Sequence, residues 1–348
     1  MKLGHREIGH GRPVCIVCEG GVTNYGRMEL AKRQIDAAVE ARADAVKFQI
    51  WKTENLVSRK ISGRMEKDLG FHWFNRLKEK EFPFEEMREI FRYAESRGIP
   101  VFATPHDEEG LDFLVRELNP GVIKVGSGEA HNDAFLRKVG RAGRPVIISF
   151  GLQTDEEILR AVAELHDAGA PEVVALHCVS LYPTPYDKAD LPRIDALRRL
   201  LNIPVGISDH SPGWHIPLAA VSKGACLVEK HLTFDRRDPR SLDNPGALLP
   251  GEFMDMVLQI RNIEEALLGL SHEERVVSLK NAREWLGQCL VAARDLTPGT
   301  VLTQEMIAFK RPAKNGLPPE ALKDLLGRKI SKSVERDEQI REEHLAPG

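Results

Sequence analysis

The sequence predicts an α/β fold, a (β/α)₈ TIM barrel followed by a small, mostly β C-terminal domain. Up to about residue 268, short apolar runs alternate with amphipathic helical segments, and eight such units fit the roughly 250 residues usual for this barrel. The runs are continuously apolar, which is typical of parallel strands covered by helices. A doubly wound open sheet is the alternative. It would need a glycine-rich phosphate turn after the first strand, and residues 20–26 (GGVTNYG) match that motif poorly.

Turn residues and polar residues bound each expected strand. In chain order the strands are residues 14–20, 45–50, 100–105, 122–127, 145–150, 173–179, 203–208 and 225–231. Helical periodicity is clear between them, as in Leu30, Ile35 and Ala38, or in Phe253, Val257, Ile260, Glu264 and Leu267. The second unit is the longest, with about 50 residues between Ile50 and Pro100. An insertion of this length at a barrel rim forms a lid or substrate wall, or is a plain surface excursion.

The pattern changes after Leu268. Residues 269–285 are highly charged, and we expect them to link a catalytic barrel domain, residues 1–268, to a C-terminal domain, residues 286–348. Turns such as 297–299 separate short apolar runs in this second domain. Because about 60 residues is marginal for an independent domain, we expect it to pack on its own barrel or on that of a partner.

Composition narrows the class of protein. With 348 residues, 42% of them hydrophobic, the chain can bury a large core. It has no apolar run near the ~20 residues of a membrane span, and its first residues lack the apolar segment of a signal peptide. We therefore expect a soluble, cytoplasmic protein without a membrane partner. A net charge of −3 and the lack of a basic stripe argue against nucleic acid as a partner.

The five cysteines predict reduced thiols, because an odd number scattered through a long chain does not suggest a disulfide framework. Cys15 and Cys18 have the C-x-x-C spacing of redox and zinc sites. They lie within an apolar strand, however, where an odd separation directs them to opposite faces. We interpret both as core residues.

Two histidines end neighbouring strands. Ser208-Asp-His210 closes the seventh strand and Glu229-Lys-His231 the eighth, and alternation puts Ser208 on the face of His210 and Glu229 on the face of His231. Active sites of TIM barrels are built at this end, where two imidazoles can hold one divalent metal. Unrelated polar residues in two loops are the alternative.

Polar side chains lie at or just after the ends of strands two to seven. They are Lys47, Gln49, Thr104, Lys124, Ser127, Ser149, Ser180, Tyr182 and Ser208. A single hydroxyl at a strand end is commonly a helix cap, whereas a lysine in an apolar barrel strand has little reason to face inward unless an anion meets it. Lysines and hydroxyls together suit a phosphorylated, carboxylated substrate, whose hydration must be replaced by several charge-assisted hydrogen bonds.

Glu19, at the end of the first strand, is the strongest carboxylate candidate for proton transfer or orientation in this pocket. A buried ion pair with one of the lysines is the alternative. Glu129 and Asp243 are rim carboxylates with weaker individual signals.

Six segments together form a specific set of motifs. They are Val46-Lys-Phe-Gln49, Thr104-Pro-His-Asp107, Lys124-Val-Gly-Ser127, His177-Cys-Val-Ser-Leu-Tyr-Pro-Thr-Pro185, Gly206-Ile-Ser-Asp-His210 and Glu229-Lys-His231. Through them the chain resembles the sialic acid synthase family, the nonulosonate synthases and their spore-coat polysaccharide relatives. Residues 286–348 resemble the antifreeze-like (SAF) domain that ends these enzymes, including Lys310-Arg-Pro312 before Asn315-Gly316, so the resemblance covers nearly the whole chain.

The resemblance implies a transferase that condenses phosphoenolpyruvate with the open-chain aldehyde of an amino sugar, such as N-acetylmannosamine. The products are a nonulosonic keto acid and phosphate. It implies a divalent metal on His210 and His231, usually Mn²⁺ with Mg²⁺ or Co²⁺ as alternatives, and a catalytic role for Glu19 beside them. It also implies a homodimer in which Arg311 of the SAF domain reaches into the barrel of the other subunit.

The remaining roles implied by the resemblance divide between the two substrates. Phosphoenolpyruvate would be held by Lys47, Thr104, Lys124, Ser127, Ser149, Ser180 and Ser208. The sugar would face Glu19, Gln49, Tyr182 and Asp243.

The chain departs from the family pattern on the side expected to face the sugar. The departures are Thr23, Asn24 and Tyr25 after the first strand, Asn244 and Pro245 after Asp243, and Phe150 and His106. The acceptor sugar is therefore open, with legionaminic, pseudaminic or spore-coat types beside N-acetylmannosamine. A relative that binds a sugar or anion without turnover is the alternative function, and a metal-dependent lyase is a weaker one.

Overall fold

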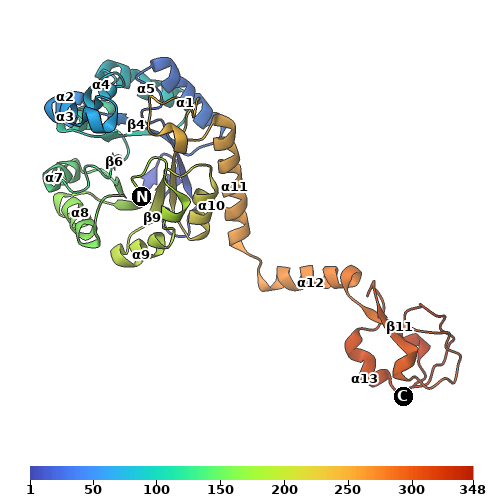
Figure 1. The fold of residues 1–348 in the computed structure, drawn as a ribbon. Coiled ribbons are helices and arrows are strands. Elements are labelled where there is room, and N and C mark those ends of the chain that lie inside the picture. Colours follow the sequence, from blue (N-terminus) through green and yellow to red (C-terminus); the bar gives the residue numbers. More distant parts are fainter. Residues whose placement is uncertain (348) are drawn as a thin grey trace. The chain divides into compact units, whose positions relative to one another are not determined.

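The computed structural model describes residues 1–347 and divides into two compact units, Met1–Leu267 and a second unit that begins at Leu268. The first unit is a closed barrel of parallel strands with helices around it (Figure 1). Neighbouring strands follow chain order, and the barrel closes where β10 pairs with β3. The TIM-barrel prediction is confirmed and the open-sheet alternative is wrong. The strands are β3 (Cys15–Glu19), β4 (Ala45–Ile50), β5 (Val101–Pro105), β6 (Ile123–Val125), β7 (Val146–Phe150), β8 (Val173–Cys178), β9 (Val205–Asp209) and β10 (Leu227–His231).

Helices follow the strands as the apolar periodicity predicts. They are α1 (Met28–Glu40), α5 (Phe84–Ser96), α6 (Glu108–Phe113), α7 (Asp133–Arg141), α8 (Asp155–Ala168), α9 (Pro192–Leu201), α10 (His215–Ser222) and α11 (Pro250–Leu268). Helix α11 buries Phe253, Val257 and Ile260. Leu267 does not continue this buried face, because the last turn of the helix is exposed.

Side chains of the barrel strands alternate between two cores. Cys15 and Val17 of β3 lie in the core inside the barrel, and Ile16 and Cys18 lie in the core between the barrel and the helices. All five cysteines are buried and free, so the prediction of reduced, packed thiols is confirmed. The same alternation makes Glu19 an inward residue at the carboxyl end of its strand.

The opposite end of the barrel carries a short hairpin, β1 (Lys2–Leu3) and β2 (Arg6–Glu7). Met1 and Leu3 join the inner core there, and the N-terminal ammonium lies 2.7 Å from Glu172 Oε1. The hairpin thus covers the inner core at the end away from the predicted site.

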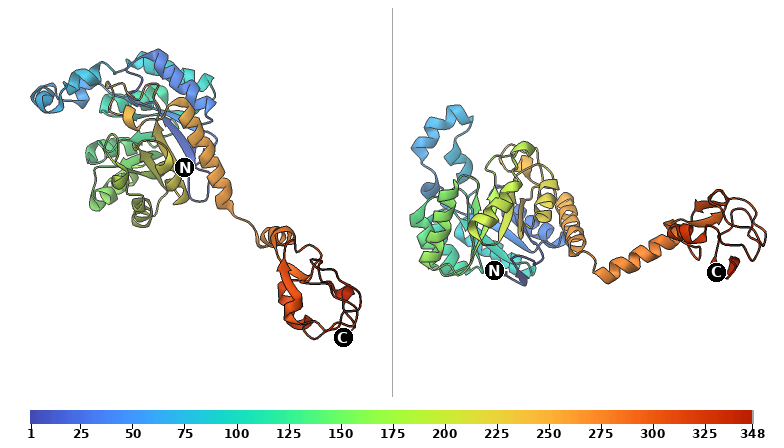
Figure 2. Two further views of the ribbon diagram at one scale, coloured as in Figure 1. Left: turned by 45° about the vertical axis from the view of Figure 1, so that its right-hand side comes forward. Right: turned by 90° about the horizontal axis from the view of Figure 1, so that it is seen from below.

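The long unit after β4 contains three extra helices, α2 (Thr53–Leu56), α3 (Arg59–Leu69) and α4 (Trp73–Lys78). They project from the barrel in both views of Figure 2. Phe74 is the buried residue of α4. Ser58 caps α3, its side chain accepting a hydrogen bond from the main-chain nitrogen of Ile61.

The second unit has its own core. It contains α12 (His272–Leu286), the antiparallel pair β11 (Cys289–Ala292) and β12 (Ile307–Lys310), and α13 (Leu322–Leu325). Leu290, Leu302 and Ile340 are among the residues buried in this core. The stretch expected to be a linker thus contains a helix, which begins at a capping box of Ser271 and Glu274.

No helix within residues 1–347 is both long enough and apolar enough to cross a membrane.

Candidate active site

The carboxyl ends of the barrel strands bring most of the predicted residues together. Barrel closure sets their order, because Glu19 is in register with Lys47 on one side and with His231 on the other. We use the name lysine cluster for the polar residues that meet here, all buried except the half-buried Gln49: Glu19, Lys47, Gln49, Thr104, Lys124, Ser149, Ser208 and Glu229.

Lys47 is the centre of the first contacts in this cluster. Its Nζ atom lies 2.6 Å from Glu19 Oε2 and 3.3 Å from Glu229 Oε1. It also donates a hydrogen bond of 3.2 Å to Thr104 Oγ1, while Gln49 Nε2 donates one of 3.1 Å to Glu19 Oε1. Burial lowers the pKa of Lys47 to about 8, although the charge of Glu229 acts in the opposite direction. Glu19 is therefore an ion-pair partner of Lys47, which was the alternative interpretation of this carboxylate.

Glu229 connects the two lysines and is absent from the predicted site residues. Ser208 Oγ donates a hydrogen bond of 2.8 Å to Glu229 Oε1, and Lys124 Nζ lies 3.7 Å from the same oxygen. Burial alone would raise the pKa of Glu229, but the charges of Lys124 and Lys47 hold it below its ordinary value. The signal for Glu229 was available, since strand alternation puts it on the face of His231.

Hydroxyl groups surround the second lysine. Lys124 Nζ donates a hydrogen bond of 2.7 Å to Ser149 Oγ. Beyond Ser149 the chain turns at Gly151, whose main-chain nitrogen donates a 3.0 Å hydrogen bond to Ser127 Oγ. A Cβ atom at Gly151 would lie 2.5 Å from Ser180 Oγ and 3.1 Å from Ser127 Oγ. A side chain at position 151 would have to displace the Ser180 hydroxyl, whereas glycine leaves room for both hydroxyls and for close approach of an anion to the backbone.

The two histidines lie side by side, as the neighbouring strand ends predict. Their ring centroids are 5.3 Å apart, and the ring of Tyr182 lies 4.2 Å from that of His210. Asp243 Oδ2 is 3.7 Å from His231 Nδ1. Gly21 lets the chain pass this pair, because its φ is +48° and a Cβ there would lie 2.8 Å from His231 Nδ1.

Both imidazoles are neutral at pH 7. Burial lowers the pKa of His210 to about 4, and burial together with the charge of Lys47 lowers the pKa of His231 to about 3. The buried Nδ1 of His231 has no hydrogen-bond partner among the described residues. Neutral imidazoles with an unpartnered nitrogen fit a divalent metal.

The protein supplies few ligands of its own for such a metal. Within residues 1–347 there is no group of three or more His, Cys, Asp or Glu side chains arranged to hold an ion. A cation at His210 and His231 would therefore complete its coordination with substrate and water, as an open catalytic site requires.

The residues that depart from the family pattern join two loops beside the histidines. Thr23 Oγ1, after β3, donates a 2.6 Å hydrogen bond to the main-chain oxygen of Leu232, after β10. Asn244 Nδ2 donates one of 2.8 Å to the Tyr25 hydroxyl. Phe150 is an exception, because it packs in the core between the barrel and the helices and does not face the pocket.

Two further predicted residues lie elsewhere. Glu129, the other weak carboxylate candidate, pairs with His106 at 3.0 Å. Arg311 belongs to the second unit, where it lines a cavity of about 420 Å³ together with Trp285 and Lys314.

Comparisons with known proteins give a consistent result. Residues 34–272 match the model of the NeuB family, and residues 287–346 match that of the SAF domain. The chain is 34% identical to the N-acetylneuraminate-9-phosphate synthase of Homo sapiens, over 97% of this chain and 94% of that protein. It is 32% identical to the N,N'-diacetyllegionaminic acid synthase of Campylobacter jejuni, over 94% and 98% of the two chains. A solved N-acetylneuraminic acid synthetase from Leptospira borgpetersenii superposes with a TM-score of 0.71 at 32% identity, covering 81% of this chain and 96% of that one.

Proposed function

The chain belongs to the NeuB family, and from this premise we propose that it condenses phosphoenolpyruvate with the open-chain aldehyde of an amino sugar. The products are a sialic-acid-like keto acid and phosphate. One observation carries the proposal: two buried lysines, each beside a carboxylate and a hydroxyl, face the same barrel end as a pair of neutral imidazoles.

The lysine cluster suits the anionic substrate. Lys124 with Ser149, and the cradle formed by Ser127 and Ser180 around Gly151, offer charge-assisted and neutral hydrogen bonds to phosphate and carboxylate oxygens. These groups are held in place by strands, so they need little reorganisation when substrate binds.

The charge balance of the cluster supports a metal. The positive charges of Lys47 and Lys124 are matched by the negative charges of Glu19 and Glu229, so the cluster is neutral before substrate binds. Phosphoenolpyruvate would bring uncompensated negative charge into this buried space, where ions without partners are costly. A divalent cation, Mn²⁺ by preference, on His210 and His231 would offset it and would polarise the aldehyde oxygen of the sugar.

In the proposed reaction the protein acts mainly by positioning the two substrates, rather than by forming covalent bonds to them. C3 of phosphoenolpyruvate attacks the aldehyde carbon, and the carbonyl oxygen takes up a proton as the carbon–carbon bond forms. Water adds at C2 and releases a proton. The bond between C2 and the phosphate oxygen then breaks, and the C2 hydroxyl gives its proton to the leaving phosphate as the keto group forms. Glu19, 2.6 Å from Lys47, is the carboxylate suited to exchange a proton at this place.

Similarity to the relatives defines the acceptor sugar less well than it defines the type of reaction. The relatives include an N-acetylneuraminate-9-phosphate synthase and an N,N'-diacetyllegionaminic acid synthase, whose names state different products. Tyr182 and Asp243, beside the two histidines, are the side chains we propose to face the acceptor.

We also propose that the chain acts as a homodimer in which Arg311 serves the site of the other subunit. Helix α12 buries none of its own residues, and Val277, Leu279 and Trp285 are each more than half exposed. Large apolar side chains exposed on a charged helix are typical of a surface that a second copy covers.

Phosphate release from phosphoenolpyruvate tests the proposed function. The full chain is supplied with Mn²⁺ and a panel of amino sugars, and the product made from each sugar is identified by mass. We expect phosphate release that requires both metal and one class of sugar. Sugar binding without release for every acceptor would instead favour the non-catalytic relative, and pyruvate formation from a nonulosonate would favour a lyase.

A further inference from the structure

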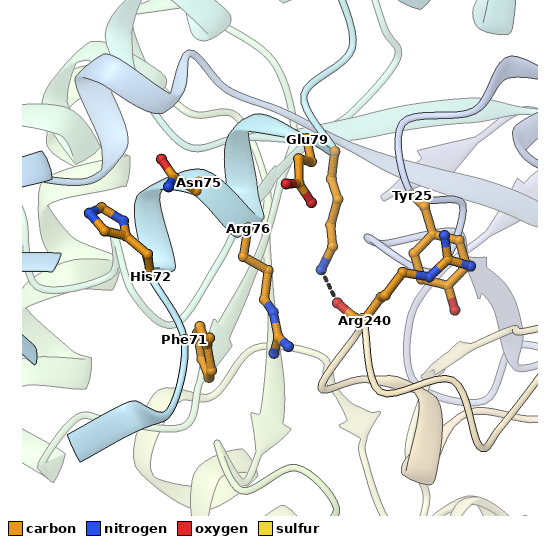
Figure 3. A pocket seen from close by; sticks show the side chains of 8 residues that line it. Tyr25, Phe71, His72, Asn75, Arg76, Glu79 and Arg240 are labelled. Carbon is orange, nitrogen blue, oxygen red and sulfur yellow. Dashed lines mark hydrogen bonds between the residues drawn. The ribbon is translucent and has the colours of Figure 1, made fainter. Parts of the chain in front are cut away.

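A polar cavity of about 440 Å³ lies among the segments that follow β3, β4 and β10 (Figure 3). Three loops build it: the loop after β3 supplies Tyr25, the insertion after β4 supplies Arg76 and Lys80, and the loop after β10 supplies Arg240. We call it the outer pocket. Phe71, His72, Asn75 and Glu79 complete its lining.

The cations of the outer pocket are poorly matched by carboxylates. Neither Arg76 nor Lys80 lies within ion-pair distance of a carboxylate in the described part of the chain, and Arg240 is paired with Asp238. The guanidinium of Arg76 instead packs on the ring of Phe71, 4.0 Å from its centroid. Figure 3 shows the Arg76 side chain extending from α4 into the space between Phe71 and Arg240.

Lys80 is the most buried of these cations. Its ammonium donates a 2.5 Å hydrogen bond to the main-chain oxygen of Arg240, drawn as the dashed line in Figure 3. Burial lowers the pKa of Lys80, and the charge of Asp243 opposes this shift. A buried ammonium whose partner is only a carbonyl gains from an anion that enters the cavity.

The outer pocket is connected to the predicted reaction centre by adjacent residues. Asp243 lies 3.7 Å from the His231 ring, and the next residue, Asn244, donates a hydrogen bond to the Tyr25 hydroxyl. The Tyr25 ring in turn carries the guanidinium of Arg240, 4.0 Å from its centroid. The departure Asn244 thus holds the departure Tyr25, which lines the outer pocket.

The walls are also held against each other. Gly26 has a φ of +66°, and a Cβ there would lie 2.9 Å from the main-chain oxygen of Glu79 and 3.0 Å from the Cα of Lys80. The first loop therefore packs directly on the turn that follows α4. This contact fixes Lys80 in relation to the barrel, as a binding pocket requires.

We propose that the outer pocket binds a phosphate group on the acceptor, so that this chain uses a phosphorylated amino sugar, with its aldehyde at the histidines and its phosphate among Arg76, Lys80 and Arg240. This inference rests on the proposed function and names its substrate class. A phosphate monoester fits better than a carboxylate, because its nearly two negative charges and several acceptor oxygens suit a cavity lined by three cations, two of them without a carboxylate partner, whereas one arginine satisfies a carboxylate.

The test offers each amino sugar of the panel both free and as its 6-phosphate, beginning with N-acetylmannosamine, at saturating phosphoenolpyruvate and Mn²⁺. We expect the wild-type chain to have a higher kcat/KM for the phosphorylated form. Arg76→Gln should lower kcat/KM for that form about 10- to 100-fold, mainly through KM, since a charge-assisted hydrogen bond is lost. It should leave the value for the free sugar within about twofold, since no contact to that sugar is removed.

Two further variants separate a binding role from a structural one. Arg76→Lys keeps a positive charge and should recover part of the lost affinity for the sugar phosphate. Arg64→Gln changes an exposed arginine on α3 of the same insertion, outside the cavity lining, and should leave both substrates unaffected. Equal use of free and phosphorylated sugars by the wild type, or an equal loss for both in Arg76→Gln, would overturn the proposal.

Direct binding separates failure of this inference from failure of the proposed function. Calorimetry of the full chain with N-acetylmannosamine and with its 6-phosphate requires no turnover. Tighter binding of the 6-phosphate, weakened in Arg76→Gln but not in Arg64→Gln, supports the outer pocket even if no phosphate is released from phosphoenolpyruvate. Equal binding of the two ligands overturns it, even if the chain proves to be a synthase.

Discussion

The lysine cluster and the outer pocket are both polar and lie at the same end of the barrel, but they are built differently. Lys47, Lys124, Glu19 and Glu229 project from neighbouring strands, are almost completely buried, and neutralise one another. The cations of the outer pocket come from loops and an insertion. Among them, Arg76 has no carboxylate partner in the described chain.

This difference separates the constant part of the proposed reaction from the variable part. Strand positions are fixed by the hydrogen bonds of a closed sheet, so a substrate common to a whole family is best held there. Loops tolerate substitution, so the substrate that differs between relatives is best recognised there. The comparison predicts that damage to the cluster affects phosphoenolpyruvate and chemistry, whereas damage to the loops affects the choice of sugar.

The largest effect is expected from His231. His231→Gln should lower kcat by about 10³-fold, comparable to the loss of a group that stabilises developing charge in the transition state. It should also abolish binding of Mn²⁺, measured by equilibrium dialysis. His215→Gln is the matched control, because His215 is an exposed histidine at the start of α10 and is not part of the pair. If His231→Gln still binds Mn²⁺, the histidine pair does not hold the metal.

Lys124 gives the next largest effect. Lys124→Met should lower kcat/KM for phosphoenolpyruvate about 100-fold, since a buried charge-assisted hydrogen bond to substrate is lost. The melting temperature should also fall, because Glu229 loses one of its two cationic neighbours. Adding Glu229→Gln to this variant should recover stability. If it also recovers the use of phosphoenolpyruvate, Lys124 only balances charge and does not bind substrate.

The lowered pKa of the buried Lys47 should be visible in the pH dependence of activity. Its pKa is lowered to about 8 by burial, so its positive charge is present below that pH and is lost above it. In the free enzyme, kcat/KM for phosphoenolpyruvate should therefore fall about tenfold per pH unit above this pKa. The unfolded chain keeps this proton to its ordinary pKa of about 10.4, so the same shift makes folding more favourable as pH rises through that window.

The Glu229→Gln variant is the control for the fall in kcat/KM at high pH. The charge of Glu229 raises the pKa of Lys47, so Glu229→Gln should move the fall in kcat/KM to lower pH. If kcat/KM falls at the same pH in this variant, a group other than Lys47 causes the fall.

The smallest effect is expected from Arg311, which extends the comparison to the second unit. Arg311→Ala should raise KM for the amino sugar about tenfold, the value of one charged hydrogen bond, with little change for phosphoenolpyruvate. Equal effects on both substrates would contradict a role at the acceptor.

Mixing of variants tests whether Arg311 acts on the other subunit. The Arg311→Ala and His231→Gln variants are first assayed separately. They are then mixed under conditions that allow subunits to exchange between dimers. If Arg311 serves the other subunit, mixed dimers contain one site with both residues intact, and sugar affinity in the active fraction returns to the wild-type value. Failure to recover, with sedimentation showing that mixed dimers form, would place Arg311 in its own subunit's site.

The sequence by itself determined the barrel and the inward face of its strands. Period-two alternation is local, so Lys47, Lys124 and both histidines could be assigned to the interior from their neighbours alone. Glu229 shows the limit of this reasoning. Its face was readable, but its contacts with Lys47 and Lys124 depend on β10 closing against β3, which brings together residues far apart in the chain.

The outer pocket could be recognised only from the tertiary structure. The insertion after β4 was expected to be a substrate wall or a plain excursion, and local pattern could not choose between them. The hydrogen bond between Asn244 and Tyr25 spans 219 positions, and the packing of Gly26 on Lys80 joins two different loops. Loops have no repeating hydrogen-bond pattern to fix where their side chains point, so the meeting of Arg76, Lys80 and Arg240 follows only from how the folded barrel brings its loops together.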